Sequence, residues 1–222
     1  MFRTVNNGGD WWTARMLNWK DGIYPYIKSG GRPYNNGQPY ADHGDGGVFS
    51  CPDNTTAWSK ADVWWTLAHP GDESTRFPRS YAVNSNAGVN ENGNANGGHF
   101  WPCIGDTSCD KNTGAISALQ TPASTIMVAE TRLPFPDISP GYMGYECTAD
   151  GQPAGGQSTS CVFSHGNGRA EFLFFDGHAK SVNGLSTIKD DLWDCYGSNG
   201  QGATQQQADL ASAANVPEWT QQ

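Results

Sequence analysis

Apolar and polar positions alternate in short runs in the second half of the chain, and these runs predict an antiparallel sheet. The aromatic run at residues 171–175 is followed by Asp176-Gly177, a dipeptide that tolerates the positive φ angles of a type I′ turn. We therefore expect a β-hairpin with residues 178–182 as its second arm. Residues 81–84 and the apolar run at 126–129 are expected to form further strands.

The first quarter of the chain has a different pattern. Trp12, Met16 and Trp19 follow the i, i+4, i+7 spacing of one helix face. Asp10 is suited to cap the start of such a helix, and Gly22 to end it. A short amphipathic helix is predicted here. Residues 48–52, which end in a proline, are expected to form a short strand.

Between these elements the chain is rich in Gly, Pro and Asn, and residues 29–47 and 134–156 are expected to be long loops. After residue 200 the composition shifts to Gly, Gln, Ala and Ser, with weak helical character at 205–214. We expect one α+β domain at residues 1–200, in which the short N-terminal helix packs on a small antiparallel sheet. Residues 201–222 are predicted to be a flexible C-terminal tail.

Composition limits the classes of partner. The 222 residues include 28 Gly and 13 Pro, whereas nine Trp and eight Tyr supply large apolar surfaces for a small core. The formal charge is −9, and Lys and Arg are not clustered. Binding to phosphate groups relies on clustered basic residues, so neither nucleic acid nor an anionic membrane surface is an expected partner.

The six cysteines form an even set without a CxxC motif, which indicates disulfides and an oxidising compartment. Fifteen pairings are formally possible for six cysteines. Each bridge would contribute about 2–4 kcal/mol to a fold rich in loops. Short loops favour two pairs, Cys103 with Cys109 and Cys147 with Cys161. The two cysteines that remain, Cys51 and Cys195, would form the third pair.

One loop has a partial calcium pattern. Asp110 and Asn112 stand at alternate positions before Gly114, and Asp106 can join them if the Cys103–Cys109 loop folds back. Calcium prefers oxygen ligands at such spacing, so Asp106, Asp110 and Asn112 are candidate ligands. The distal glutamate of an EF-hand is absent. An Asx-turn is the structural alternative.

Three titratable side chains flank the predicted hairpin. His165, Asp176 and His178 could converge at one edge of it, and two histidines with a carboxylate make an acceptable ligand set for zinc or iron. In the simpler, structural interpretation, Asp176 accepts hydrogen bonds within the turn, His178 faces solvent and His165 caps a backbone group. Glu130, at the end of its strand, is expected either to pair, with Arg132 or with a hairpin histidine, or to lie at the rim of the sheet.

The same residues carry a family resemblance. His165, a glycine-containing gap and Asp176-Gly177-His178 resemble the C-terminal signature of bacterial type IV pilin-like and type II secretion pseudopilin-like proteins. That signature is a histidine separated by nine residues from Asp-Gly. Ten residues, 166–175, separate the two here. The difference implies one inserted residue in the glycine loop or a bulge in the strand.

Four further segments are similar to segments of that family and follow its order. They are PYIK within residues 24–28, the F-x-CP-D segment at 49–53, SY-x-x-N at 80–84 and the strand at 121–130 that ends in Glu130. With the hairpin, the resemblance spans roughly residues 24 to 182.

The resemblance implies a pilin-like head and a structural, non-enzymatic role. Such a head assembles with like pilin or pseudopilin subunits into a filament, outside the inner membrane or at the cell surface after export. Members of the family attach to the membrane through an N-terminal hydrophobic helix. No stretch here approaches the roughly 20 apolar residues that such a helix needs. We therefore expect the chain to be the soluble head, with Met1 added. Related pseudopilins also bind calcium near the C-terminal sheet.

Two other functions fit parts of the sequence. A secreted carbohydrate-binding module would stack sugar rings on exposed aromatic side chains, for which the candidates are Trp11, Trp58, Trp64 and Trp101. A metal-dependent hydrolase would use Glu130, Glu171 or Asp176 as carboxylates, or His165 and His178 around the metal. The sequence has no nucleophile elbow, HExxH or P-loop motif, which disfavours the hydrolase.

Overall fold

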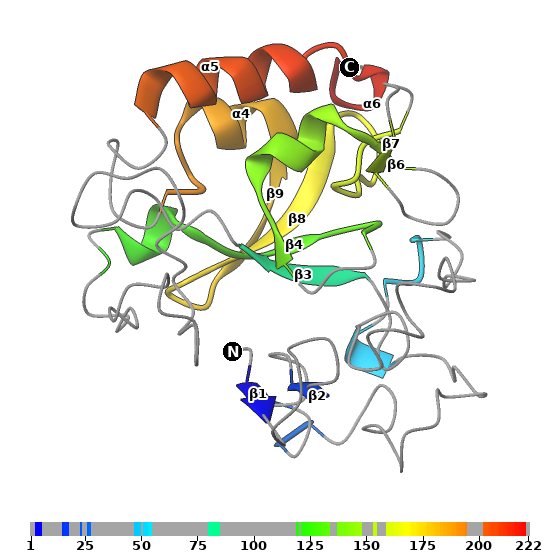
Figure 1. Ribbon diagram of the computed structural model, residues 1–222, viewed down its shortest axis with the longest axis vertical. Helices are drawn as coiled ribbons and strands as arrows, with labels where there is room; N and C mark the ends of the chain where they lie inside the picture. The colour runs from blue at the N-terminus through cyan, green and yellow to red at the C-terminus, as the bar shows by residue number, and fades with distance from the viewer. Residues whose placement is uncertain are drawn as a thin grey trace.

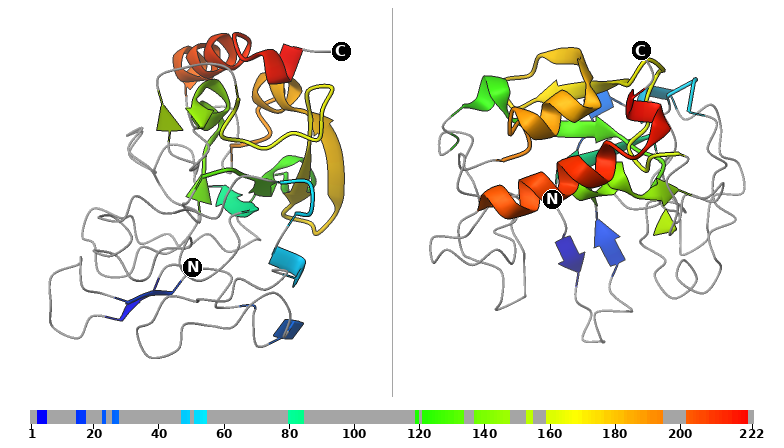
Figure 2. Two further views of the ribbon diagram at one scale, coloured as in Figure 1. Left: turned by 90° about the vertical axis from the view of Figure 1, so that its right-hand side faces the viewer. Right: turned by 90° about the horizontal axis from the view of Figure 1, so that it is seen from above.

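A mainly antiparallel sheet and three C-terminal helices dominate the fold, which is of the predicted α+β class (Figure 1). The computed structural model describes residues 3–5, 15–17, 23, 26–27, 47–49, 51–54, 80–84, 119, 121–133, 137–147, 153–154, 159–194 and 202–220. The helices lie together on one side of the sheet, whereas the small β1–β2 ribbon lies at the opposite end of the molecule (Figures 1 and 2).

The sheet has the strand order β5-β3-β4-β8-β9. Its antiparallel strands are β3 (Tyr81–Asn84), β4 (Ile126–Glu130), β8 (Arg169–Phe174) and β9 (Ala179–Asn183). The two-residue β5 (Asp137–Ile138) runs parallel to β3. The strands expected at residues 81–84 and 126–129, and both arms of the hairpin, are therefore confirmed.

The turn of the β8–β9 hairpin differs from the predicted type I′. Gly177 has a φ of 94°, but Asp176 is not in the left-handed region. The Gly177 N–H donates to the carbonyl of Phe174 at 2.9 Å, and the Phe174 N–H donates to that of His178 at 2.9 Å. The connection is thus a three-residue loop with a left-handed glycine at its end, a common alternative to the two-residue turn.

The core lies between the sheet and the C-terminal helices. Burial alternates along β8, with Ala170, Phe172 and Phe174 on the buried face. The Phe172 ring packs edge-on against Trp193, with 5.8 Å between ring centroids. The indole N–H of Trp193 donates to Thr187 Oγ1 at 2.9 Å, so this buried donor is satisfied.

Residues 202–220 belong to this core, so the prediction of a flexible tail is wrong. They form α5 (Gly202–Ala213) and α6 (Pro217–Thr220), which follow α4 (Gly184–Lys189). Ala213, Val216 and Trp219 are members of the buried cluster. Trp219 is 2% exposed, and its indole N–H donates to the carbonyl of Met143 at 3.1 Å.

The predicted N-terminal helix is wrong where the structure describes it. Residues Arg15–Leu17 form β2, which pairs antiparallel with β1 (Arg3–Val5). Ile23, Tyr26 and Ile27 have helical conformation. A short isolated helix is marginal in water, and pairing with β1 overrides the i, i+4, i+7 spacing of three apolar residues that suggested it.

The strand expected at residues 48–52 is a turn. Gly47–Phe49 is the 3₁₀ helix η2, and the N–H of Asn54 donates to the carbonyl of Cys51 at 3.1 Å. Phe49 is buried. Phe49, an apolar residue that suggested a strand, is therefore a buried residue at the end of η2, just before the turn.

The expected loop at 134–156 contains short elements and one disulfide. They are β5, the 3₁₀ helix η5 (Pro140–Gly144), β6 (Glu146–Cys147) and β7 (Pro153–Ala154); a further 3₁₀ helix, η4 (Pro122–Ser124), precedes β4. The predicted bridge between Cys147 and Cys161 is confirmed.

The predicted bridge between Cys51 and Cys195 is contradicted, because Cys51 is a buried free cysteine. Its environment is a polar turn, where the thiol faces a histidine instead of another cysteine. Cys103, Cys109 and Cys195 lie outside the described residues. Within the described part of the chain, no helix has the length and apolar character required to cross a membrane.

Candidate functional site: a thiol, an imidazole and two carboxylates

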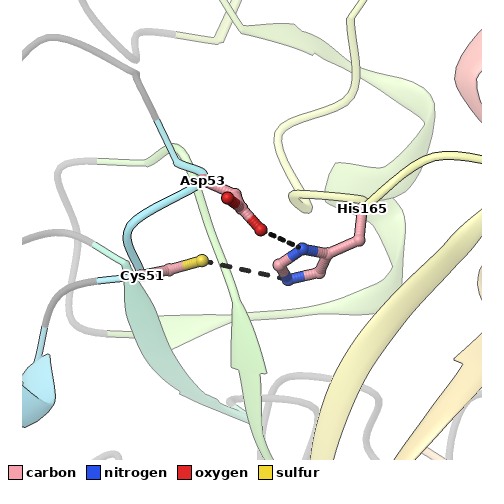
Figure 3. A group of neighbouring side chains, drawn as sticks. All are labelled: Cys51, Asp53 and His165. Atoms are coloured by element: carbon pink, nitrogen blue, oxygen red, sulfur yellow. Dashed lines mark hydrogen bonds and ion pairs between the residues drawn. The ribbon is translucent and has the colours of Figure 1, made fainter.

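Four polar side chains from distant parts of the sequence meet at the end of β4, the central strand of the sheet. Cys51 and Asp53 come from the turn after η2, and Glu130 is the last residue of β4. His165 precedes the glycine loop that leads into β8. Figure 3 shows Cys51 and Asp53 facing the His165 ring from the same turn.

The imidazole of His165 lies between two carboxylates. Its Nδ1 is 3.1 Å from Asp53 Oδ2, and its Nε2 is 2.8 Å from Glu130 Oε2. The Glu130 side chain is only 2% exposed, whereas that of Asp53 is 70% exposed. Burial alone would lower the pKa of His165, but the hydrogen bond and charge of Glu130, followed by those of Asp53, leave the pKa raised.

Cys51 approaches the same nitrogen, with Sγ 3.8 Å from His165 Nε2. Burial is the largest cause that raises the pKa of the Cys51 thiol. Backbone hydrogen bonds from Asp53 and Asn54 oppose this rise in pKa, while the charge of Glu130 and its hydrogen bond with the thiol add to it. The thiol is therefore protonated at neutral pH.

Aromatic side chains support the cluster. The ring of Phe163 packs edge-on against His165 with 5.0 Å between centroids, and the guanidinium of Arg132 lies 4.6 Å above the Phe163 ring. Tyr81 is opposite Glu130 in the β3–β4 pairing. Burial, and then the charges of Glu130, Cys51 and Glu171, raise the pKa of Tyr81 to about 12, so its phenol stays protonated.

The spatial arrangement matches that of a nucleophile, a base and an orienting carboxylate, with Cys51, His165 and Asp53 in these three positions. Two features disfavour that chemistry. His165 Nε2 lies nearer to Glu130 Oε2, at 2.8 Å, than to the thiol sulfur, at 3.8 Å, and the thiol pKa is raised where a nucleophile needs it lowered. The cluster is better suited to hold a cation, since donor atoms of Cys51, Asp53 and His165 lie within 4.8 Å of one another.

The structure does not bring His165, Asp176 and His178 together. His165 is at the base of the hairpin, while Asp176 and His178 are at its tip, beyond the six residues of β8. His178 Nδ1 lies 2.6 Å from Asp176 Oδ1, and its ring stacks on Phe174 at 4.4 Å. Asp176 also accepts from the His178 backbone N–H at 3.1 Å, as expected of a turn residue. This backbone bond, followed by the His178 side chain, lowers the pKa of Asp176.

Other predicted sites lie outside the described residues. These are the calcium candidates Asp106, Asp110 and Asn112, and the aromatic candidates Trp11, Trp58, Trp64 and Trp101. Of the alternatives predicted for Glu130, the pair with a histidine is the one that the structure has, and that histidine is His165.

Sequence reasoning misses Cys51 and Asp53 as members of the site. The cysteine count places Cys51 in a disulfide, and Asp53 stands out only as part of the F-x-CP-D segment. A signal is nevertheless present, since Cys51, Asp53, Glu130 and His165 all belong to segments that carry the family resemblance. Comparisons with protein-family models, curated proteins and solved structures found no match for this chain.

Proposed function

We propose that this chain is the globular head of an exported pilin-like or pseudopilin-like subunit, which assembles with like subunits into a filament. The role is structural. The head contributes subunit contacts and a displayed surface, and a hydrophobic helix elsewhere in the complete subunit would anchor it. The proposal rests on the resemblance of five segments, and one observation about their packing supports it.

That observation is that hydrogen bonds and an ion pair join four of the five segments. The Cys51 N–H donates to Ser80 Oγ at 2.8 Å, and Asn84 Nδ2 donates to the carbonyl of Ile126 at 2.8 Å. Glu130 pairs with His165 at 2.8 Å. Segments that matched by chance would have no reason to contact one another through their characteristic polar residues. Their mutual contacts are those of one folding unit.

The extra residue between His165 and Asp176 is also compatible with this proposal. The β8–β9 ladder keeps one register from Arg169 to Leu173. The loop before it has three consecutive positive φ angles, 94° at Gly166, 52° at Asn167 and 66° at Gly168. An insertion in such a loop leaves the pairing of the hairpin unchanged.

Immunogold labelling of intact cells that produce the protein from its natural gene tests the proposal. Antibodies against this chain are expected to label filaments or surface patches, and the extracted protein is expected to contain the Cys147–Cys161 bridge. Chemical cross-linking in those cells should yield ladders of the subunit. Uniform cytoplasmic labelling together with reduced Cys147 and Cys161 would contradict export and the filament role.

A single substitution sharpens this test. Tyr26, within the PYIK segment, is 87% exposed, so Tyr26→Glu should leave the fold intact. If this segment contributes to subunit contacts, the variant should be exported but give shorter cross-linked ladders. The matched control is Tyr145→Glu, at another tyrosine that is 53% exposed. Equal ladders for both variants would exclude the segment from the interface.

A further inference from the structure

The structural role leaves the thiol and imidazole cluster without a task, although it contains two buried donor groups, the Cys51 thiol and the Glu130 carboxylate. We propose that it is a site for a zinc-class divalent metal, with Cys51 Sγ, His165 Nε2 and Glu130 Oε2 as ligands. Asp53 holds the other ring nitrogen of the histidine. The site shares no residue with the predicted calcium loop and does not depend on filament assembly.

The two donor distances that involve His165 Nε2 are close to those of a tetrahedral zinc site. Zn–S and Zn–N bonds of about 2.3 and 2.0 Å place the two donors roughly 3.6 Å apart. Sγ and Nε2 are 3.8 Å apart. A nitrogen and an oxygen ligand are about 3.3 Å apart in the same geometry. Nε2 and Glu130 Oε2 are 2.8 Å apart, so the carboxylate needs to withdraw by only about half an ångström.

The position of Asp53 is that of an outer carboxylate in a metal site. It accepts from Nδ1 at 3.1 Å, which leaves Nε2 as the nitrogen that faces Cys51 and Glu130. Histidines that bind zinc commonly have such a carboxylate on the second nitrogen, which fixes the ring orientation and makes the ligand more basic. The Cys-Pro-Asp turn thus supplies a ligand and the group that orients the neighbouring ligand.

The donor types select the metal. A thiolate and an imidazole favour Zn²⁺ or Co²⁺ over Ca²⁺ or Mg²⁺, which prefer oxygen ligands. Binding displaces the proton of the Cys51 thiol and the proton on Nε2, and both pass to solvent. A divalent cation in exchange for two protons leaves the net charge of the cluster unchanged. Three protein ligands leave a fourth position for water.

Cobalt titration of the purified full chain, treated with a chelator and kept without reductant, tests the site. One equivalent of Co²⁺ should bind and produce a thiolate-to-cobalt charge-transfer band, which Zn²⁺ then abolishes. Cys51→Ser and His165→Gln should abolish that band. Asp53→Asn should weaken binding about 10- to 100-fold. His178→Gln is the matched control because His178 also pairs with an aspartate, and it should leave the titration unchanged.

A second measurement avoids variants that fail to fold. In the unaltered protein, Zn²⁺ should slow alkylation of Cys51 at least about tenfold, as mapped on the Cys51 peptide by mass spectrometry. Equal alkylation with and without Zn²⁺ would overturn the proposal. So would a charge-transfer band that survives in folded Cys51→Ser, since that result would assign the metal to another cysteine.

Discussion

Individual charged residues in this molecule differ in how well their surroundings compensate for burial. Among the described residues, Asp191 is an unfavourable case. It follows α4 with a φ of 55°, and its neighbour Asp194 is also an acid. Burial, and then the charge of Asp194, raise the pKa of Asp191 to about 6. Its ionised form therefore destabilises the fold at neutral pH.

Asp191→Asn should stabilise the protein at neutral pH. The folded pKa is raised above the unfolded value, so protonated Asp191 contributes stability that is fully present below about pH 4 and lost as the pH rises through about 6. Asparagine removes the charge and tolerates the left-handed backbone. After allowance for solvent screening, the gain at neutral pH should be about 1 kcal/mol.

Urea unfolding at several pH values between about 4 and 8 measures this effect. The variant and the unaltered protein should have similar stability at the acid end and diverge above about pH 6. Asp190→Asn, at the exposed neighbouring carboxylate, is the control. A constant difference at every pH would show that the effect is not electrostatic.

Glu218 is the opposite case, a largely buried carboxylate whose charge is compensated by several partners. It forms a two-bond pair with Arg132 at 2.8 and 3.0 Å and accepts from the N–H groups of Ser160 and Ser164. The hydroxyl of Ser164 donates to it as well, at 2.7 Å. These bonds attach α6 to the chain around the disulfide.

Glu218→Gln should lower the free energy of unfolding by about 2–3 kcal/mol. The amide keeps the shape but removes the negative charge that pairs with Arg132, and it turns an NH₂ group toward other donors. Thermal and urea unfolding measure the loss. Glu171→Gln, at an exposed carboxylate in β8, should change stability by less than about 0.5 kcal/mol. Equal effects in the two variants would contradict the network.

At the scale of elements, predictions from the sequence succeed where local pattern and long-range pairing agree. The hairpin, β3 and β4 have apolar runs of strand length bounded by turn residues, and each pairs inside the sheet. The prediction for the segment around Arg15–Leu17 fails because its partner, β1, is chosen by tertiary structure. Periodicity over three apolar positions does not contain that information.

The candidate site could be predicted only in part, for a similar reason. His165 and Glu130 stand out in the sequence as titratable residues beside strands. The turn that carries Cys51 and Asp53 reaches them from more than 70 residues away in sequence, through contacts that no local pattern encodes. The cysteine is also misassigned from the sequence because an even cysteine count favours full pairing.

The glycine loop before β8 offers a test at this scale. Gly168 has a φ of 66°, and a Cβ there would lie 2.7 Å from the carbonyl oxygen of Trp219 in α6. Gly166 has a φ of 94°, and no atom of the described residues lies within 4 Å of where its Cβ would be. Alanine would therefore strain the backbone at either position, but only at Gly168 would its Cβ also make a close contact.

Gly166→Ala should cost about 1–2 kcal/mol, the strain of a left-handed alanine. Gly168→Ala should cost about 3 kcal/mol or more, because the backbone of α6 must also move. Urea unfolding of both variants gives the comparison. Equal losses would mean that α6 does not pack against the loop as described.

At the scale of the whole molecule, the C-terminal helices complete the core. Their composition conceals this role, since α5 is mainly Gln, Ala and Ser and offers little large apolar surface. Small residues instead permit close approach. A Cβ at Gly144 in η5 would lie 2.1 Å from Ser212 Oγ, and one at Gly184 would lie 2.5 Å from Trp219. These two glycines thus let α5 and α6 reach the core.

Truncation before Gly202 distinguishes a packed C-terminal region from the flexible tail expected from composition. The truncated chain loses the buried side chains of Ala213, Val216 and Trp219 and the Glu218 pair with Arg132. Removal of Trp219 alone is expected to cost about 3–5 kcal/mol. The free-energy loss from the complete deletion should exceed about 5 kcal/mol, the lower end of the stability range of typical domains.

We therefore expect the truncated chain to lose its near-ultraviolet circular dichroism and to bind a hydrophobic dye, as a chain without fixed side-chain packing does. Ala214→Ser, at an exposed position just after α5, should change neither signal. Trp219→Ala should fall between the two, with a lowered but still cooperative unfolding transition. If the long truncation unfolds like the intact chain, the helices contribute nothing to the core, and the sheet must be stabilised by other parts of the chain.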